Sequence, residues 1–184
     1  PEYLPMLRKI CDENSVLLIA DEVMSGWFRT GKVFAMEHWN VLPDILTTRK
    51  DCTSAYTPTG ITATTKDVAS FFDDEFFCHG HTYAYHALCL SAIPAAVEEY
   101  TKLMDSGLPQ RVAPYLEKKL YELAENHLLI GDVRGIGHFW ALEIVKNRET
   151  KEPFDVKAAK ITAKALMTGK IAVDFQSTKR SPNR

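Results

Sequence analysis

Two charged residues follow two predicted short strands, and their side chains could support chemistry on an aldehyde. Asp21 directly follows residues 16–20, and Lys50 lies just beyond residues 45–48. A lysine that loses its proton near neutral pH forms a Schiff base with a carbonyl, and a buried carboxylate keeps a pyridine nitrogen protonated. The pair would therefore suit a pyridine aldehyde held between them. Either residue alone is also common without function, as a strand-end aspartate or a solvated lysine.

Alternating helices and strands must position this pair. An amphipathic helix is predicted first, from apolar residues at helical spacing: Leu4, Leu7, Ile10 and Cys11. Residues 16–20 are continuously apolar, which predicts a strand buried on both faces of a parallel sheet, with Asp21 at its carboxyl end. Ligands bind at that end in open α/β sheets. Further strands are predicted at 45–48 and 60–65, beyond a loop rich in glycine and aromatic residues.

The second half of the chain predicts a smaller αβ unit, and we place a domain boundary near residue 105. Its predicted elements, in chain order, are helices at 92–105 and 109–127, a turn at 131–137, a strand at 138–145, a helix at 156–167 and a strand at 170–175. The last residues, 176–184, are polar and are expected to fray.

Composition excludes several classes of partner. The 184 residues are 46% hydrophobic and 25% charged, which is typical of a globular protein. The net charge of −2 offers no basic surplus for nucleic acid or an anionic membrane. No apolar run approaches the length of a membrane-spanning helix and no leader pattern opens the chain, so we expect a cytoplasmic protein. Free thiols are expected for the widely spaced cysteines, which are Cys11, Cys52, Cys78 and Cys89.

Five short motifs, taken in order, resemble those of the class III aminotransferases of the ω-amino acid:pyruvate type. They are Asp21-Glu22-Val23 after a strand, Arg29-Thr30-Gly31, Pro43-Asp44-Ile45, Lys50 itself, and His79-Gly80-His81-Thr82-Tyr83. Each motif alone is weak, but their order is specific. The resemblance covers roughly residues 3–155.

This resemblance implies a fold and a cofactor. It implies the α/β fold of fold type I transferases that depend on pyridoxal 5'-phosphate, with a mostly parallel sheet in a large domain and a small αβ C-terminal unit. Residues 1–105 would form the C-terminal half of the large cofactor-binding domain, and residues 106–184 part of the small C-terminal domain. The implied catalytic residue is Lys50, and the implied cofactor-binding residues are Asp21 at the pyridinium, Val23 on the ring, Lys50, and Thr82 at the phosphate across a dimer interface.

The resemblance also implies a reaction and partners. A homodimer would move an amino group from an ω-amino acid or amine to a 2-oxo acid such as pyruvate, with Lys50 as Schiff-base lysine and proton-transfer base. Residues 37–39 (EHW), together with HGHTY, favour the ω-amino acid, taurine or β-alanine branch.

The chain departs from the family pattern around the lysine and at both ends. The family has small residues beside the lysine, whereas Arg49 and Asp51 flank Lys50 here. Asp51 is expected to pair with Lys50 and raise its pKa. Stretches that the family has before Leu4 and near its C-terminal substrate-binding arginine have no counterpart in the sequence. We therefore expect a fragment that self-associates and binds cofactor poorly or not at all.

Other interpretations remain open at this stage. The chain could be a non-catalytic α/β module that self-associates through exposed apolar surface. It could also be a nucleotide hydrolase, since residues 26–33 (GWFRTGKV) approach a P-loop, but Val33 has no hydroxyl for Mg²⁺. His79, His81 and His86 could bind a metal, but no carboxylate stands at a typical spacing, so no metal is expected.

Overall fold

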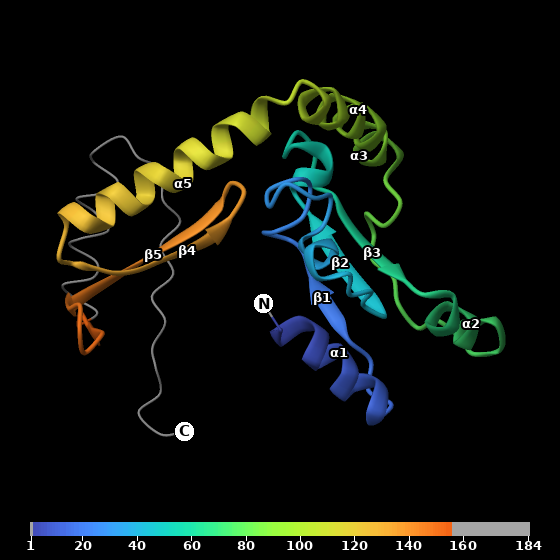
Figure 1. Ribbon diagram of the computed structural model, residues 1–184. Coiled ribbons are helices and arrows are strands. Elements are labelled where there is room, and N and C mark those ends of the chain that lie inside the picture. Colours follow the sequence, from blue (N-terminus) through green and yellow to red (C-terminus); the bar gives the residue numbers. More distant parts are fainter. Residues whose placement is uncertain (1, 156–184) are drawn as a thin grey trace. The chain divides into compact units, whose positions relative to one another are not determined.

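A computed structural model describes residues 2–155 (Figure 1). Within the described residues, the chain divides into two compact units, one formed by 2–117 with 135–140 and the other by 118–134 with 141–155. The helix predicted at 156–167, the strand at 170–175 and the polar segment 176–184 lie outside the described residues. The candidate site belongs to the first unit.

A three-stranded sheet with one helix against it forms the centre of the first unit (Figure 1). Helix α1 (Tyr3–Glu13) precedes β1 (Ile19–Asp21), and the strand order is β1, β2 (Ile45–Arg49), β3 (Gly60–Thr64). β1 and β2 are parallel, and β2 and β3 are antiparallel. The first predicted helix and all three predicted strands are confirmed, although β1 begins later than its apolar run.

The prediction that this run is buried on both faces is wrong. Leu18 and Ala20 are buried, but Val16, Leu17 and Ile19 are each more than half exposed. The described residues cover only one face of β1, where α1 and η1 (Ala35–Trp39) supply the packing partners. The buried core there consists of Cys11, Leu18, Ala20, Met36 and Val41, with Leu4, Leu7 and Trp39 packed against it.

One carboxylate links α1 to the sheet. Asp44, just before β2, accepts a hydrogen bond from the Leu18 amide and pairs with Arg8 of α1, both at 2.7 Å. The Leu18 amide, followed by the Arg8 guanidinium, lowers the pKa of Asp44. This junction fixes where β1 and β2 begin, and therefore where their carboxyl ends fall.

Four further helices follow the first sheet. They are α2 (Lys66–Asp74), α3 (Ala87–Leu90), α4 (Ala92–Asp105) and α5 (Leu108–Asn126). α4 has its predicted bounds and α5 differs by about one residue at each end. Gly107, between them, has φ of +67°, a conformation that glycine adopts without a steric penalty. α2 and α3 were not predicted.

The second sheet corrects the prediction of a turn at 131–137. That segment is strand β4 (Ile130–Ile136), followed by β5 (Phe139–Asn147) and β6 (Glu152–Pro153). Gly131 lies inside β4, and a glycine is required there because a Cβ would stand 2.7 Å from the side chain of Val145, which is 1% exposed. The true turn is at Gly137, where φ is +62°.

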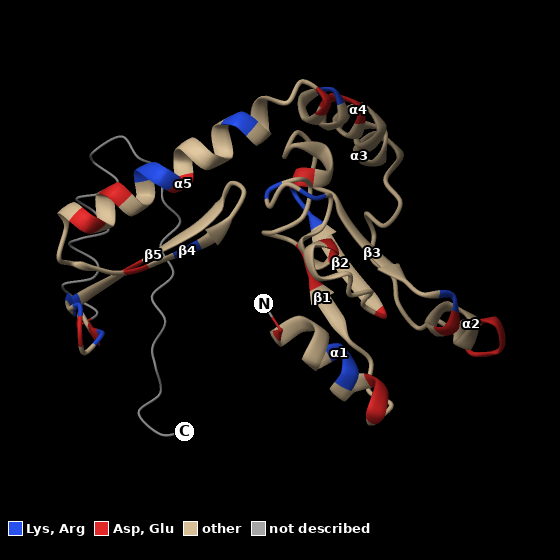
Figure 2. Ribbon diagram, viewed as in Figure 1, with Lys and Arg blue, Asp and Glu red and all other residues tan. Residues whose placement is uncertain are grey.

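Charges of both signs are interspersed along the helices (Figure 2). On α5, for example, Lys118 and Lys119 both pair with Glu122. Within residues 2–155, no helix is long and apolar enough to cross a membrane, and no group of three His, Cys, Asp or Glu side chains could hold a metal ion. The four cysteines are free thiols.

Candidate active site

The register of the first sheet brings Asp21 and Lys50 to the same edge. Asp21 is the last residue of β1 and lies opposite Thr47 of β2. Lys50 directly follows Arg49, the last residue of β2. Because the two strands are parallel, the chain leaves both at the same edge of the sheet, after Asp21 in β1 and two residues further along, after Arg49, in β2, and both side chains are exposed there. An amine and a carboxylate therefore share one edge of the sheet, although Asp21 is exposed where a buried carboxylate was expected.

Lys50 has an unusual backbone conformation. Its φ is +62° and its ψ is −74°, a combination that L-residues adopt rarely and at a cost in strain. Its carbonyl oxygen accepts hydrogen bonds from the Ala55 amide at 2.9 Å and from the amide of Thr53 at 3.2 Å. The Thr53 hydroxyl, which is almost fully buried, is 3.3 Å from the same oxygen. The lysine is thus held by its own peptide group, while its side chain stays exposed.

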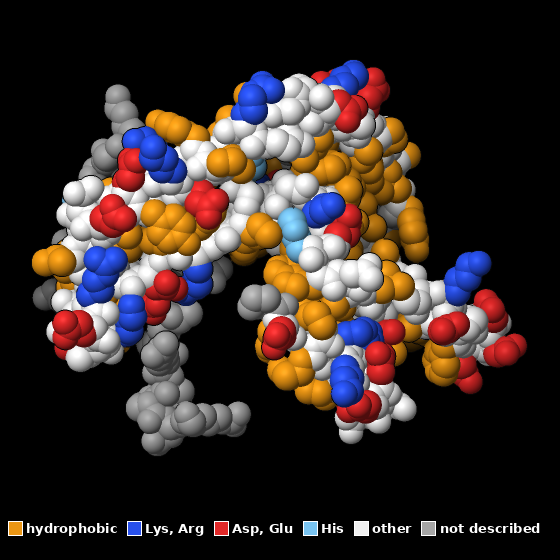
Figure 3. Space-filling view, in the orientation of Figure 1, with side chains coloured by type: hydrophobic (Ala, Val, Ile, Leu, Met, Phe, Trp, Pro, Cys, Tyr) orange, Lys and Arg blue, Asp and Glu red, His pale blue; other side chains and the backbone are white. Residues whose placement is uncertain are grey.

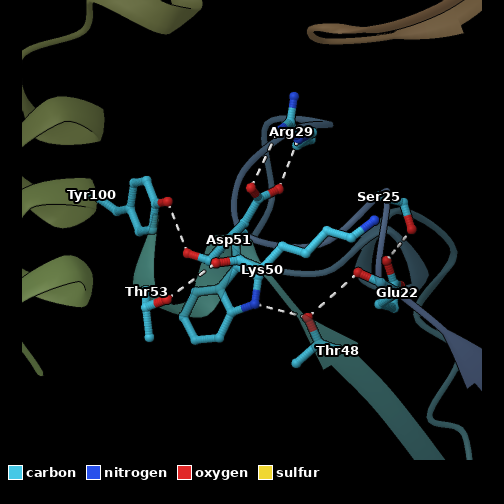
Figure 4. A network of polar contacts seen from close by, with 9 residues as sticks. Glu22, Ser25, Arg29, Thr48, Lys50, Asp51, Thr53 and Tyr100 are labelled. Carbon is cyan, nitrogen blue, oxygen red and sulfur yellow. Dashed lines mark hydrogen bonds and ion pairs between the residues drawn. The ribbon is translucent and has the colours of Figure 1, made fainter. Parts of the chain in front are cut away.

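Asp51 has a different partner from the one that the sequence predicts. Its carboxylate accepts two hydrogen bonds from Arg29, at 2.9 Å from Nε and 3.2 Å from Nη2. Figure 4 shows the Lys50 side chain running away from this carboxylate, in the direction of Ser25 and Glu22. The hydrogen bonds to Asp51 raise the pKa of Arg29, so the guanidinium stays charged. The expected pairing of Asp51 with Lys50 is therefore replaced by a bidentate pair with Arg29.

Aromatic residues surround this ion pair. The Tyr100 hydroxyl donates to the Asp51 carbonyl oxygen at 2.8 Å. The ring centroids of Trp27 and Phe28 lie 6.3 Å and 6.2 Å from that of Tyr100. The loop that carries Arg29 thus packs against α4, the helix that also holds the Asp51 backbone.

Glu22 is a buried structural carboxylate that sequence reasoning did not single out. It is 2% exposed, and it accepts hydrogen bonds from the Met36 amide at 2.9 Å and from the Ser25 hydroxyl. Its carbonyl oxygen lies 3.5 Å from the Thr48 hydroxyl, which also accepts from the Trp27 indole at 2.8 Å. Its place in the Asp-Glu-Val motif was the available indication. Glu22 fixes the loop after β1, whereas Asp21 is left facing solvent.

The other predicted cofactor residues lie in two different places. Val23 is half-buried just after β1, and its amide donates to the Asp21 carboxylate at 3.0 Å. Thr82 lies in an exposed turn between α2 and α3, closed by the bond from the Ala84 amide to the His81 carbonyl. The structure thus brings Val23 beside Asp21, and it places Thr82 at the surface.

A cavity of about 440 Å³ lies beside Asp51 within the first unit. Its walls are mainly apolar side chains, including Tyr100, Leu103, Met104 and Val112, with Arg29 at its edge. Neither Asp21 nor Lys50 lines it. The cavity is therefore separate from the edge of the sheet where the amine and the carboxylate meet.

The residues at the sheet edge fit a pyridine aldehyde. The amine can bond the aldehyde carbon, and the carboxylate can accept a hydrogen bond from a protonated ring nitrogen. Both groups are exposed at one edge, with the half-buried, apolar side chain of Val23 beside the carboxylate. An amine and a carboxylate at neighbouring parallel strands are the side-chain types that a bound pyridoxal phosphate ring requires.

Comparison with known proteins identifies the family of this chain. The family model "Aminotransferase class-III" matches residues 1–178, and the chain belongs to this family. It is 37% identical over 161 residues to the putrescine–pyruvate aminotransferase of Pseudomonas aeruginosa, covering 84% of this chain and 34% of that protein. It is 39% identical over 160 residues to the taurine–pyruvate aminotransferase of Bilophila wadsworthia, covering 82% and 34%.

Solved structures confirm the fold. The taurine:2-oxoglutarate aminotransferase of Bifidobacterium kashiwanohense, in complex with pyridoxal phosphate and glutamate, matches with a TM-score of 0.82 and 35% identity, covering 91% of this chain and 39% of that one. The α/β fold is that of the fold type I transaminases, as predicted. The chain spans about a third of the length of the curated relatives it matches. The comparisons support neither the nucleotide hydrolase nor the non-catalytic module.

Proposed function

We propose that this chain is part of a pyridoxal-phosphate-dependent aminotransferase and carries its reactive lysine, Lys50. The observation that carries the proposal is the parallel register of β1 and β2, which sets Asp21 and Lys50 at one sheet edge. Family membership supports it, because class III aminotransferases use this cofactor. When bound, pyridoxal phosphate supplies an electron sink for the charge left on the substrate carbon.

Each residue has a distinct task in this proposal. Asp21 accepts a hydrogen bond from the ring nitrogen and favours its protonated form. Val23 would pack on the ring, and Lys50 would hold the aldehyde carbon. With a substrate amine bound in place of the lysine, Lys50 Nζ would be the base that removes the proton from the amino-bearing carbon.

The substrates proposed are an ω-amino acid or amine as donor and a 2-oxo acid as acceptor. Relatives named for putrescine, for taurine and for pyruvate support this choice. We further propose that residues 1–105 belong to the large cofactor-binding domain and 106–184 to the small one. The four free cysteines favour a reducing, cytoplasmic compartment.

We also propose that the whole protein is a homodimer in which Thr82 binds the cofactor phosphate of the partner subunit. The exposed position of Thr82, in a turn away from β1 and β2 in the sequence, supports a role outside its own subunit. Its hydroxyl and backbone amide are both donors that phosphate oxygens can accept.

Covalent trapping tests the assignment of Lys50. The chain is mixed with pyridoxal phosphate, reduced with borohydride and digested, and the modified lysines are located by mass spectrometry. We expect modification at Lys50 well above that at Lys66, an exposed lysine of α2. Lys50→Ala should remove the preferred site and Lys66→Ala should leave it. Equal modification of both lysines in the unaltered chain would contradict the proposal.

A further inference from the structure

The residue after the proposed reactive lysine carries a charge that ought to oppose its function. An unpaired carboxylate beside a lysine stabilises the ammonium form and so removes the nucleophile. Asp51 is nevertheless half-buried, with a side chain 20% exposed, and its carboxylate is turned to Arg29. The structure thus pairs Asp51, the neighbour least favourable to a neutral Lys50, with the positive charge of Arg29.

We propose that Arg29 is a positioning residue that sequesters the Asp51 carboxylate and thereby keeps the Lys50 amine available to react. The proposal rests on the proposed function for its purpose, since it explains how a lysine next to an aspartate stays reactive. Its physical content concerns only the basicity of Lys50, which can be measured without any cofactor.

The geometry favours Arg29 over Lys50 as the partner of Asp51. A planar guanidinium matches both carboxylate oxygens at once, and the two contacts of 2.9 Å and 3.2 Å have this arrangement. A lysine ammonium offers only a point charge on a flexible stem. Because the Arg29 side chain is 51% exposed, the pair contributes little to stability, and its effect is on the local charge.

Both partners are held in place by their backbones. The Arg29 carbonyl oxygen accepts a hydrogen bond from the His138 amide at 2.8 Å, and the Asp51 carbonyl oxygen accepts one from Tyr100 at 2.8 Å. The carboxylate therefore cannot swing toward Lys50 without breaking the bidentate pair. Figure 4 shows Arg29 and Tyr100 on different sides of Asp51, with the Lys50 side chain leaving in another direction.

Charged side chains near Lys50 come from its own segment, from the end of β1 and from the loop after it. These groups are Arg49, Asp51, Asp21, Glu22 and Arg29. Glu22 is already hydrogen-bonded to a backbone amide, and Asp21 orients on the Val23 amide. Asp51 is thus the carboxylate whose influence on the amine depends on a single removable partner.

Competitive labelling of individual amines tests the proposal. Each protein is treated at pH 8 with a trace of acetic anhydride, and the acetylation rate of Lys50 is measured by mass spectrometry relative to that of Lys66. Arg29→Met should slow Lys50 by about threefold, because the freed carboxylate raises its basicity. Adding Asp51→Asn in the same chain should restore the original rate. Arg111→Met, at an exposed arginine that donates to the Ser106 carbonyl oxygen at 3.2 Å, is the matched control and should change nothing.

The rescue separates charge from structure. If Arg29 merely supports the loop, the double variant will be as slow as Arg29→Met or slower, which would overturn the proposal. An unchanged rate in Arg29→Met would overturn it equally. If circular dichroism shows that Arg29→Met does not fold, Arg29→Lys is used instead. Lysine keeps the positive charge but cannot bind both carboxylate oxygens at once. Arg29→Lys should therefore slow the acetylation of Lys50, and adding Asp51→Asn should remove that effect.

The outcome is distinguishable from that of the proposed function. If borohydride trapping showed no preference for Lys50 while the labelling pattern held, the electrostatic role of Arg29 would stand and the cofactor assignment would fall. A preferred Lys50 adduct with labelling that ignores Arg29 would give the opposite result.

Discussion

At the scale of single residues, the proposed reactive lysine is held in a backbone conformation that its own residue type resists. Lys50 combines φ of +62° with ψ of −74° directly after a regular strand, and three hydrogen bonds to its carbonyl oxygen hold it there. Strain of this kind persists only where the surrounding structure fixes it, and it concentrates at functional positions. The strain therefore supports a functional role for the residue independently of its family.

This conformation predicts an inverted order of stability between two substitutions. Lys50→Gly should be more stable than Lys50→Ala by about 1 kcal/mol, because glycine relieves the positive φ whereas alanine keeps its Cβ. At a strand or helix position with negative φ the order would be reversed. Urea unfolding of both variants measures the difference, and the same pair at Lys66, which starts α2, is the control. A Lys50→Ala variant as stable as Lys50→Gly would show that the backbone is not strained.

Residue types and their places after predicted strands suggested Asp21 and Lys50 as site candidates, and the family resemblance added Val23 and Thr82. They were not enough to predict what surrounds them, because partner choice depends on geometry that a linear sequence does not contain. Asp51 lies next to Lys50 in sequence but 22 residues from Arg29, and the tertiary loop decides for Arg29. Glu22 follows Asp21 directly, yet it is buried while Asp21 is exposed.

At the scale of elements, the spacing of apolar residues predicted the long helices. It did not predict features that depend on contacts with other parts of the chain. The α4 pattern reaches its true bounds because a single apolar stripe specifies a helix locally. The burial of β1 could not be predicted, because it depends on which elements cover each face of the sheet. Gly131 was taken as a turn residue, but it is required by the bulk of Val145 across the sheet. The antiparallel direction of β3 likewise depends on tertiary pairing.

The Gly131 contact predicts a sharp local cost. Gly131→Ala places a Cβ at 2.7 Å from Val145 Cγ2, so the second unit should lose about 1–3 kcal/mol through overpacking. Val145→Ala in the same chain should recover part of that loss, since it removes the clashing methyl groups. Thermal unfolding of the two single variants and the double variant measures the coupling. Strict additivity of the two changes would rule out the contact as the cause.

The junction between α1 and the first sheet predicts a pH dependence of stability. Because the folded state lowers the pKa of Asp44, it binds fewer protons than the unfolded state. The stabilisation is therefore complete above the unfolded pKa of about 4 and is lost as the pH falls through the folded value. Asp44→Asn should lower the free energy of unfolding by about 1.5 kcal/mol at neutral pH. The difference in unfolding free energy between this variant and the original chain should become smaller as the pH falls.

Urea unfolding at a series of pH values measures this difference. Asp73→Asn, at the exposed end of α2, is the matched control for the loss of one carboxylate. If the difference in unfolding free energy between the original chain and Asp44→Asn stayed constant from about pH 6 to about pH 2, the ionised form of Asp44 would not be what stabilises the junction.

At the scale of the whole molecule, apolar side chains remain on the surface of the first unit, notably around α3 and α4 (Figure 3). The segment between α2 and α3 is especially aromatic and exposed, with Phe76 at 86%, Tyr83 at 75% and Tyr85 at 87%. Exposed apolar surface of this kind marks an interaction site in soluble proteins. The same segment carries Thr82, which we propose to act across a subunit interface.

These two features together predict where self-association is lost. Phe76→Asp and Tyr85→Asp should each weaken the proposed homodimer by at least about tenfold, because a charge would be buried where an aromatic ring packs. Sedimentation equilibrium measures the change, and circular dichroism confirms that the fold is kept. Leu128→Asp, at a residue 77% exposed in the second unit, is the control for adding a charge to an exposed apolar position. If all three substitutions weakened association equally, the subunits would associate through apolar surface in general. If only Leu128→Asp weakened it, the interface would lie away from Thr82, and the proposed contact of Thr82 with the partner's phosphate would be contradicted.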